Sequence, residues 1–208
     1  MKKNLPLILT GFLVFLSFAL FSFLVHKNTF SQLDFNTTVR IQNSFPRFFD
    51  TPFSVLSLLG SFEVVSLIML VLWAANRKLR FIYALLFFGL IHFFEFFGKA
   101  FVTHPGPPYL FFRYDIGFNF PTSYIQPGSS YPSGHLARTF FLTILIYFFV
   151  SRNKKLSTNK KILIYFLVII FDIFMFISRI YLGEHWLSDV IGGSILGASL
   201  GFFSLAFL

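Results

Sequence analysis

The chain alternates long apolar runs with short polar segments. A helix needs roughly 20 apolar residues to cross a bilayer core about 30 Å thick. Six stretches meet this requirement: residues 5–25, 52–75, 81–103, 133–150, 162–181 and 187–208. The pattern therefore predicts an all-α fold, a polytopic membrane bundle of six transmembrane helices that forms a single domain over residues 1–208.

The first apolar run, residues 5–25, follows Lys2 and Lys3 at the N-terminus. A secretory signal peptide has the same basic start, but its apolar region is shorter and ends at a small-residue cleavage site. This run is longer and has no clear site of that kind. We expect an uncleaved signal anchor.

Composition agrees with a membrane protein. The chain is 56% hydrophobic and only 12% charged, whereas soluble domains carry about 25% charged residues. The sequence also has no cysteine, which excludes a disulfide scaffold, a structural thiolate zinc site and a thiol nucleophile.

The basic residues predict the orientation of the bundle. Lysine and arginine total 17 against 8 acidic residues, a net charge of +9. The bases at 2–3, 77–80 and 152–161 all fall on one side of a six-helix topology, in segments that hold no acidic residue. The positive-inside rule assigns this side, with both termini, to the cytoplasm. The basic excess is thus explained without a nucleic-acid partner.

Several ionisable residues lie within or beside the predicted spans, where they are costly and usually functional. The topology places them at one depth, just beneath the extracytoplasmic surface. They are Lys99, Arg138, Arg179, His135, His185 and Asp189.

The start of the fourth predicted helix has the composition of an anion site. Pro132 and Ser133 suit a helix start, where free backbone N–H groups and the helix dipole attract anions. Ser133 adds a hydroxyl, Gly134 permits close approach, and His135 is placed to protonate a leaving group. The alternative is that Ser133 is an N-cap and His135 only an interfacial polar residue.

A second group surrounds the connection between the last two predicted helices. His185 and Asp189 are four residues apart and share a face on a helix. The carboxylate would fix the imidazole tautomer and leave the other nitrogen free as a nucleophile or base. Arg179 offers a planar fork suited to phosphate oxygens. The alternative is a structural ion pair between Arg179 and Asp189.

These residues resemble the signature of the type 2 phosphatidate phosphatase superfamily, which includes vanadium haloperoxidases and bacterial acid phosphatases. The Pro-Ser-Gly-His motif is intact at 132–135. The motif of Ser-Arg, five residues, His, three residues and Asp is intact from Ser178 to Asp189. The resemblance covers residues from about 75 to the C-terminus, with the motifs inside 99–189.

In this chain the first motif of the family is incomplete. Lys99 is present, but Gly106 stands where the family has an arginine before proline. Losing one charge-assisted hydrogen bond of this kind costs about 1.5–3 kcal/mol of binding. Arg138, one helical turn after the His135 motif, is the favoured replacement; Arg113 and a protonated His104 are the other candidates.

The helix that carries Lys99 holds two more polar residues. Glu95 lies four residues before Lys99, and His92 a further three residues back, so the three side chains share one helix face. We expect a buried polar relay that supports Lys99, structural rather than catalytic.

The resemblance implies a six-helix membrane enzyme that hydrolyses a lipid phosphate or diphosphate without a metal or other cofactor. Candidate substrates are a polyprenyl diphosphate, phosphatidylglycerol phosphate and phosphatidate. His185, oriented by Asp189, would attack phosphorus to give a phosphohistidine, and His135 would protonate the leaving group. The phosphate oxygens would be held by Lys99, Ser133, Gly134, Arg179 and Arg138.

Two other functions remain open at this stage. A lipid phosphotransferase would use the same chemistry and pass the phosphate to an acceptor other than water. A degenerate protein that only binds or transports phospholipids is favoured by Gly106. Such a protein has no chemical need for His135, His185 and Asp189 at these spacings.

Overall fold

The computed structural model describes residues 4–76, 79–117 and 128–208. Within these ranges the chain forms α-helices, two one-turn 3₁₀ helices and connections, with no extended strand, which confirms the predicted all-α class. The helices are α1 (Leu5–His26), α2 (Ser31–Ser44), α3 (Asp50–Leu58), α4 (Phe62–Asn76), α5 (Phe81–Phe101), α6 (Gly134–Arg152), α7 (Thr158–Tyr181) and α8 (Leu187–Phe207).

Five helices are long and apolar enough to span a membrane: α1, α5, α6, α7 and α8. The sixth predicted span, residues 52–75, is the pair α3 and α4, bent by 40°. At the bend Gly60 N–H donates to the carbonyl of Ser57, and the Ser61 hydroxyl accepts from the N–H of Val64 to restart the helix. Counted as one span, the bent pair completes the six.

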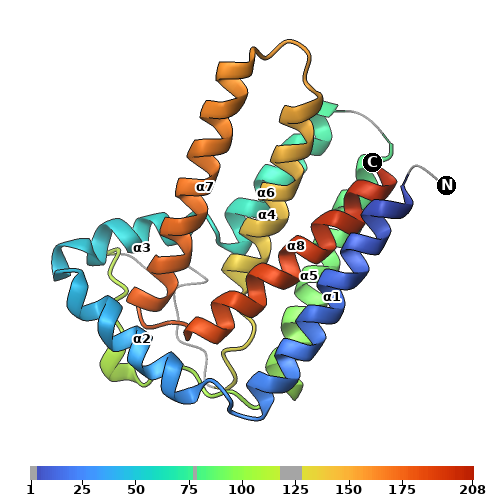
Figure 1. The fold of residues 1–208 in the computed structure, drawn as a ribbon. Coiled ribbons are helices and arrows are strands. Elements are labelled where there is room, and N and C mark those ends of the chain that lie inside the picture. Colours follow the sequence, from blue (N-terminus) through green and yellow to red (C-terminus); the bar gives the residue numbers. More distant parts are fainter. Residues whose placement is uncertain (1–3, 77–78, 118–127) are drawn as a thin grey trace.

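Helix α8 is the centre of the bundle and packs against α6, α1 and α5 (Figure 1). Small residues make this possible. A Cβ at Gly193 would overlap the carbonyl oxygen of Ser133, and one at Gly197 would overlap that of Ala137. Two turns of α8 therefore lie directly against the backbone of α6, so the two helices are held in fixed register.

The start of α1, the end of α8 and the connection from α6 to α7 lie at one end of the bundle, as Figure 1 shows. Asn4, Arg80 and Arg152 line a common pocket there, as the topology predicts for the basic side. The other basic residues predicted for this side include Lys2, Lys3, Arg77 and Lys78, which are outside the described residues. The opposite end carries α2, α3 and the connection from α7 to α8.

Helix α2 was not predicted from the sequence, because its buried face is polar and its exposed face carries apolar residues. Its buried face is polar, with Asp34, Thr38 and Gln42 one turn apart, whereas Leu33 and Phe35 are exposed. This is the reverse of a helix that packs on an apolar core. The polar face covers the end of the bundle where the polar residues of the motifs meet.

Candidate active site

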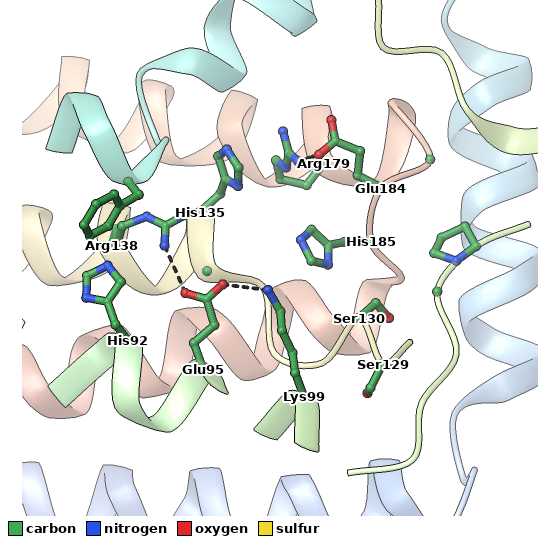
Figure 2. A pocket seen from close by; sticks show the side chains of 15 residues that line it. His92, Glu95, Lys99, Ser129, Ser130, His135, Arg138, Arg179, Glu184 and His185 are labelled. Carbon is green, nitrogen blue, oxygen red and sulfur yellow. Dashed lines mark hydrogen bonds and ion pairs between the residues drawn. The ribbon is translucent and has the colours of Figure 1, made fainter. Parts of the chain in front are cut away.

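A cavity of about 250 Å³ lies where the ends of α5 and α7 meet the starts of α6 and α8. Figure 2 shows side chains from these elements pointing into it. Six of the eight site residues predicted from the sequence line the cavity: Lys99, Gly134, His135, Arg138, Arg179 and His185. The other two, Ser133 and Asp189, are fully buried just behind it.

His185 and Asp189 are held together by the start of α8. Nδ1 of His185 lies 3.4 Å from Oδ2 of Asp189, and the Trp186 N–H donates to the same oxygen at 2.9 Å. The helix begins at Leu187 rather than at His185, so the imidazole precedes it. Burial, reinforced by the positive charge of Arg179, lowers the pKa of His185 well below its usual value. The imidazole is therefore neutral at pH 7.

Arg179 is fully buried at the end of α7. Its guanidinium contacts the Ser57 hydroxyl of α3 and forms an ion pair with Glu184. The alternative prediction, an ion pair between Arg179 and Asp189, is wrong, because the Asp189 carboxylate faces His104 and His185 instead. Nε of Arg179 has no hydrogen-bond partner in the part of the chain that the structure describes, so this donor is free for a bound anion.

The first turn of α6 brings Gly134 and His135 to the cavity. Ser133 is the N-cap residue, but its side chain makes no capping hydrogen bond, and its hydroxyl has no partner among the described residues. Ser133 is therefore the N-cap residue, as the alternative interpretation had it, but its hydroxyl takes no part in capping. Its buried N–H donates to the backbone carbonyl of Asp189 at 3.0 Å, which joins the two motifs directly.

Glu95 links the two cations on this side of the cavity. Its carboxylate accepts from Lys99 Nζ at 2.8 Å and from Arg138 Nη1 at 3.0 Å, as drawn in Figure 2. The same carboxylate packs against the Cα of Gly134, where a side chain at this position would overlap it. The predicted support of Lys99 by Glu95 is confirmed. His92 is not part of that contact: its Nδ1 bonds the carbonyl of Phe88, and its Nε2 has no hydrogen-bond partner among the described residues. The anion at the start of α6 in this structure is Glu95 itself.

Only one of the three candidate replacements for the missing arginine reaches the cavity. Arg138 lines it and donates through Nε to the carbonyl of Gly60, in the bend between α3 and α4. Arg113 instead points at the backbone of α2 and stacks on Tyr181. His104 lies behind Asp189.

Some contributors to the site were not predicted. The sequence analysis gave no role to Glu184, Ser57 or Gly60. Glu184 immediately precedes His185 inside the third motif, so its position next to the cavity follows from the spacing. The contacts of Ser57 and Gly60 depend on the bend between α3 and α4, for which the apolar pattern gives no signal.

Comparison with known proteins gives one family and two similar structures. The family model of the PAP2 superfamily matches residues 77–208. A curated relative, phosphatidylglycerophosphatase B of Bacillus subtilis (strain 168), is 38% identical over 74 residues. That match spans 35% of this chain and 36% of the relative, so it covers only about a third of the relative's length.

Two crystal structures share the fold. One is a transmembrane PAP2-type phosphatidylglycerolphosphate phosphatase from Bacillus subtilis, with a TM-score of 0.76, 21% identity, and coverage of 100% of this chain and 96% of that one. The other is LpxE of Aquifex aeolicus, with a TM-score of 0.61, 23% identity, and coverage of 83% and 94%. At these identities the likeness concerns the fold.

Proposed function

The chain belongs to the PAP2 superfamily, and from this we propose that it is a membrane phosphatase that hydrolyses the phosphomonoester or diphosphate of a lipid. One observation carries the proposal. His135, His185, the buried Arg138 and Arg179 and the partly exposed Lys99 converge on a single cavity. Asp189 contacts the imidazole of His185 on the side away from this cavity. A protein that only binds headgroups needs the cations but not this pair of histidines.

The proposed reaction has two steps. Nε2 of His185 attacks phosphorus in line and forms a P–N bond, while the bond from phosphorus to the leaving oxygen breaks and His135, in its protonated form, gives that oxygen a proton. Asp189 stabilises the positive charge that develops on His185. Water then attacks the phosphohistidine with His135 as base, which releases inorganic phosphate and restores both histidines.

The cations stabilise the negative charge of the transferring phosphoryl group, the main requirement of such a transition state. We propose that Lys99, Arg138 and Arg179 bind the non-bridging oxygens together with the backbone N–H of Gly134. In this proposal Arg138 supplies the guanidinium that is missing at Gly106. The substrate phosphate takes the place that the Glu95 carboxylate holds beside Lys99 and Arg138.

A lipid substrate suits the size and position of the cavity. At about 250 Å³ it is smaller than pockets that enclose a whole drug-sized ligand, so it fits a headgroup with the tail outside. It lies at the end of the bundle opposite the basic segments. By the positive-inside rule, we propose that this end faces the extracytoplasmic side of the cell membrane and that both termini are cytoplasmic.

Phosphate release by the detergent-purified protein tests the proposal. A polyprenyl diphosphate, phosphatidylglycerol phosphate and phosphatidate are offered in parallel with a chelator present. The variants are His185→Ala and, as a matched control, His26→Ala, which replaces an exposed histidine outside the cavity. We expect turnover that resists the chelator, survives in the control and vanishes in His185→Ala.

Other outcomes separate the alternatives. Release that appears only when an acceptor lipid is added would indicate a phosphotransferase. Folded protein that releases nothing under either condition would favour a headgroup-binding protein and overturn the proposal.

A further inference from the structure

A buried carboxylate from α2 reaches the start of α8, away from the cavity. Asp34 is only 1% exposed. Oδ1 accepts the backbone N–H of Ser188 at 2.8 Å, and Oδ2 accepts the Ser188 hydroxyl, also at 2.8 Å. Ser188 immediately precedes Asp189, so α2 is attached to the turn of α8 that carries the proposed orienting carboxylate.

His104 fills the space between the two carboxylates. Its Nε2 lies 3.1 Å from the Ser188 hydroxyl, 3.5 Å from Oδ1 of Asp189 and 3.7 Å from Oδ2 of Asp34. Asp189 therefore has a histidine on each oxygen, His185 at Oδ2 and His104 at Oδ1. The Ser130 hydroxyl also interacts with Asp189, but it brings no charge.

The position of His104 is fixed by its backbone. The His104 carbonyl accepts from the N–H of Ser130 at 2.9 Å and from its hydroxyl at 3.2 Å. The next carbonyl, that of Pro105, accepts from Trp186 Nε1 at 2.8 Å. His104 is thus tied to the connection that contains His185, and it does not line the cavity.

The hydrogen bonds of the Ser188 hydroxyl indicate whether Nε2 of His104 carries a hydrogen. The Ser188 hydroxyl has one hydrogen and two neighbours. If it donates to Asp34, then Nε2 of His104 must carry a hydrogen to bond the same oxygen. Oδ1 of Asp189 lies 3.5 Å from this Nε2 and accepts no hydrogen bond among the described residues. If it donates to Nε2 instead, a lone pair faces Asp189 and Asp34 must be protonated. Burial raises the pKa of Asp34, but its bonds from Ser188 and the neighbouring His104 oppose that rise.

The first arrangement is the favourable one, because a buried carboxylate needs donors on both oxygens. Two carboxylates in one buried cluster also need a compensating positive or partly positive group between them. The side chain of His104 is the group that provides it.

We propose that His104 and Asp34 are positioning residues, a relay that holds Asp189 from behind and through it sets the direction of the His185 imidazole. This inference rests on the proposed function. Asp34 orients Ser188 and His104, the Nε2 of His104 lies against Oδ1 of Asp189, and Oδ2 of Asp189 remains directed at His185. The relay touches neither the substrate nor the cations of the cavity.

Steady-state kinetics of His104→Ala and His104→Gln test the relay. We expect His104→Ala to lower kcat by about 10- to 100-fold, the usual effect of removing a residue that orients a catalytic ligand. The inhibition constant of inorganic phosphate should stay near that of the wild type, because the cations are intact. Glutamine places an N–H near the position of Nε2, so His104→Gln should recover most of the lost kcat. His26→Ala is the matched control.

The result that overturns the relay is a folded His104→Ala protein with wild-type kcat. A parallel loss of kcat and phosphate binding that glutamine does not rescue also overturns it, because that result indicates a purely structural role. If the alanine variant fails to fold, Asp34→Asn tests the relay through the same two measurements, kcat and the inhibition constant of phosphate. Asp115→Asn, at an exposed carboxylate, is its control. If the wild type itself shows no turnover, that result contradicts the proposed function, and the relay, which rests on it, is contradicted as well.

Discussion

The substitution Gly193→Ala tests how the packing of α8 on α6 holds the site together. The added Cβ would overlap the carbonyl oxygen of Ser133 and lie 3.1 Å from its carbonyl carbon and 3.3 Å from the backbone nitrogen of Ala137. These are backbone atoms, so no side-chain rotation relieves the overlap, and α6 must move. The same movement disturbs the hydrogen bond from the Ser133 N–H to the carbonyl of Asp189.

The size of the effect follows from the contact. Overpacking of a closely packed interior destabilises a protein by about 1–3 kcal/mol. The movement also separates His135, at the start of α6, from His185 and Asp189 at the start of α8. A shift of about 1 Å between catalytic groups lowers the rate about 100-fold. We therefore expect a lower melting temperature and a kcat reduced by about two orders of magnitude.

Two further alanine variants serve as comparisons. Gly89 is exposed on α5, and a Cβ there meets nothing within 4 Å, so Gly89→Ala should keep full activity and gain about 0.5–1 kcal/mol of stability from the helix propensity of alanine. Gly197 meets the carbonyl of Ala137, one turn further from the site. Gly197→Ala should lose similar stability but less kcat.

Thermal unfolding and phosphate release in the same detergent measure both effects. If Gly193→Ala unfolds at the wild-type temperature and keeps wild-type kcat, the fixed register of α6 and α8 does not position the site. If all three variants lose activity equally, the loss is unrelated to the contact with Ser133.

The remaining predictions concern charges in the cavity. The lowered pKa of His185 means that the folded protein binds fewer protons than the unfolded chain below pH 6.5. The melting temperature should therefore fall as the pH drops from 6.5, while the acidic limb of kcat/KM lies below pH 6.5; a limb above 6.5 contradicts this. Glu95→Gln frees Lys99 and Arg138 for an anion and removes one negative charge, so inorganic phosphate should inhibit about tenfold more strongly. Weaker inhibition would show that Glu95 holds these cations in their binding positions.

The spans and the motif residues were predictable because their signals are local. About 20 apolar residues in a row define each membrane helix, and the interval from Arg179 to Asp189 lies within one helix end and the next helix start. The ion pair of Glu95 with Lys99 was predictable for the same reason, since it joins residues one turn apart on α5.

Contacts between distant segments were not predictable. The ion pair of Glu95 with Arg138 joins α5 to α6. It depends on how these two helices pack, which the apolar pattern does not show. Helix α2 was missed because its buried face is polar: Asp34 faces His104 and Ser188 rather than lipid or an apolar core. The pairing of Arg179 with Glu184 depends on the chain turning back after α7.

The central claim is that His185 is the nucleophile, and a phosphoenzyme assay tests it most directly. The purified protein is mixed with a lipid substrate labelled in its phosphate and quenched in alkali within milliseconds. We predict label on the protein that is stable to alkali and released by acid, as expected of phosphohistidine, and located by peptide mapping at His185. His185→Ala should carry no label. Turnover without any labelled protein, or label retained in His185→Ala, would contradict the account.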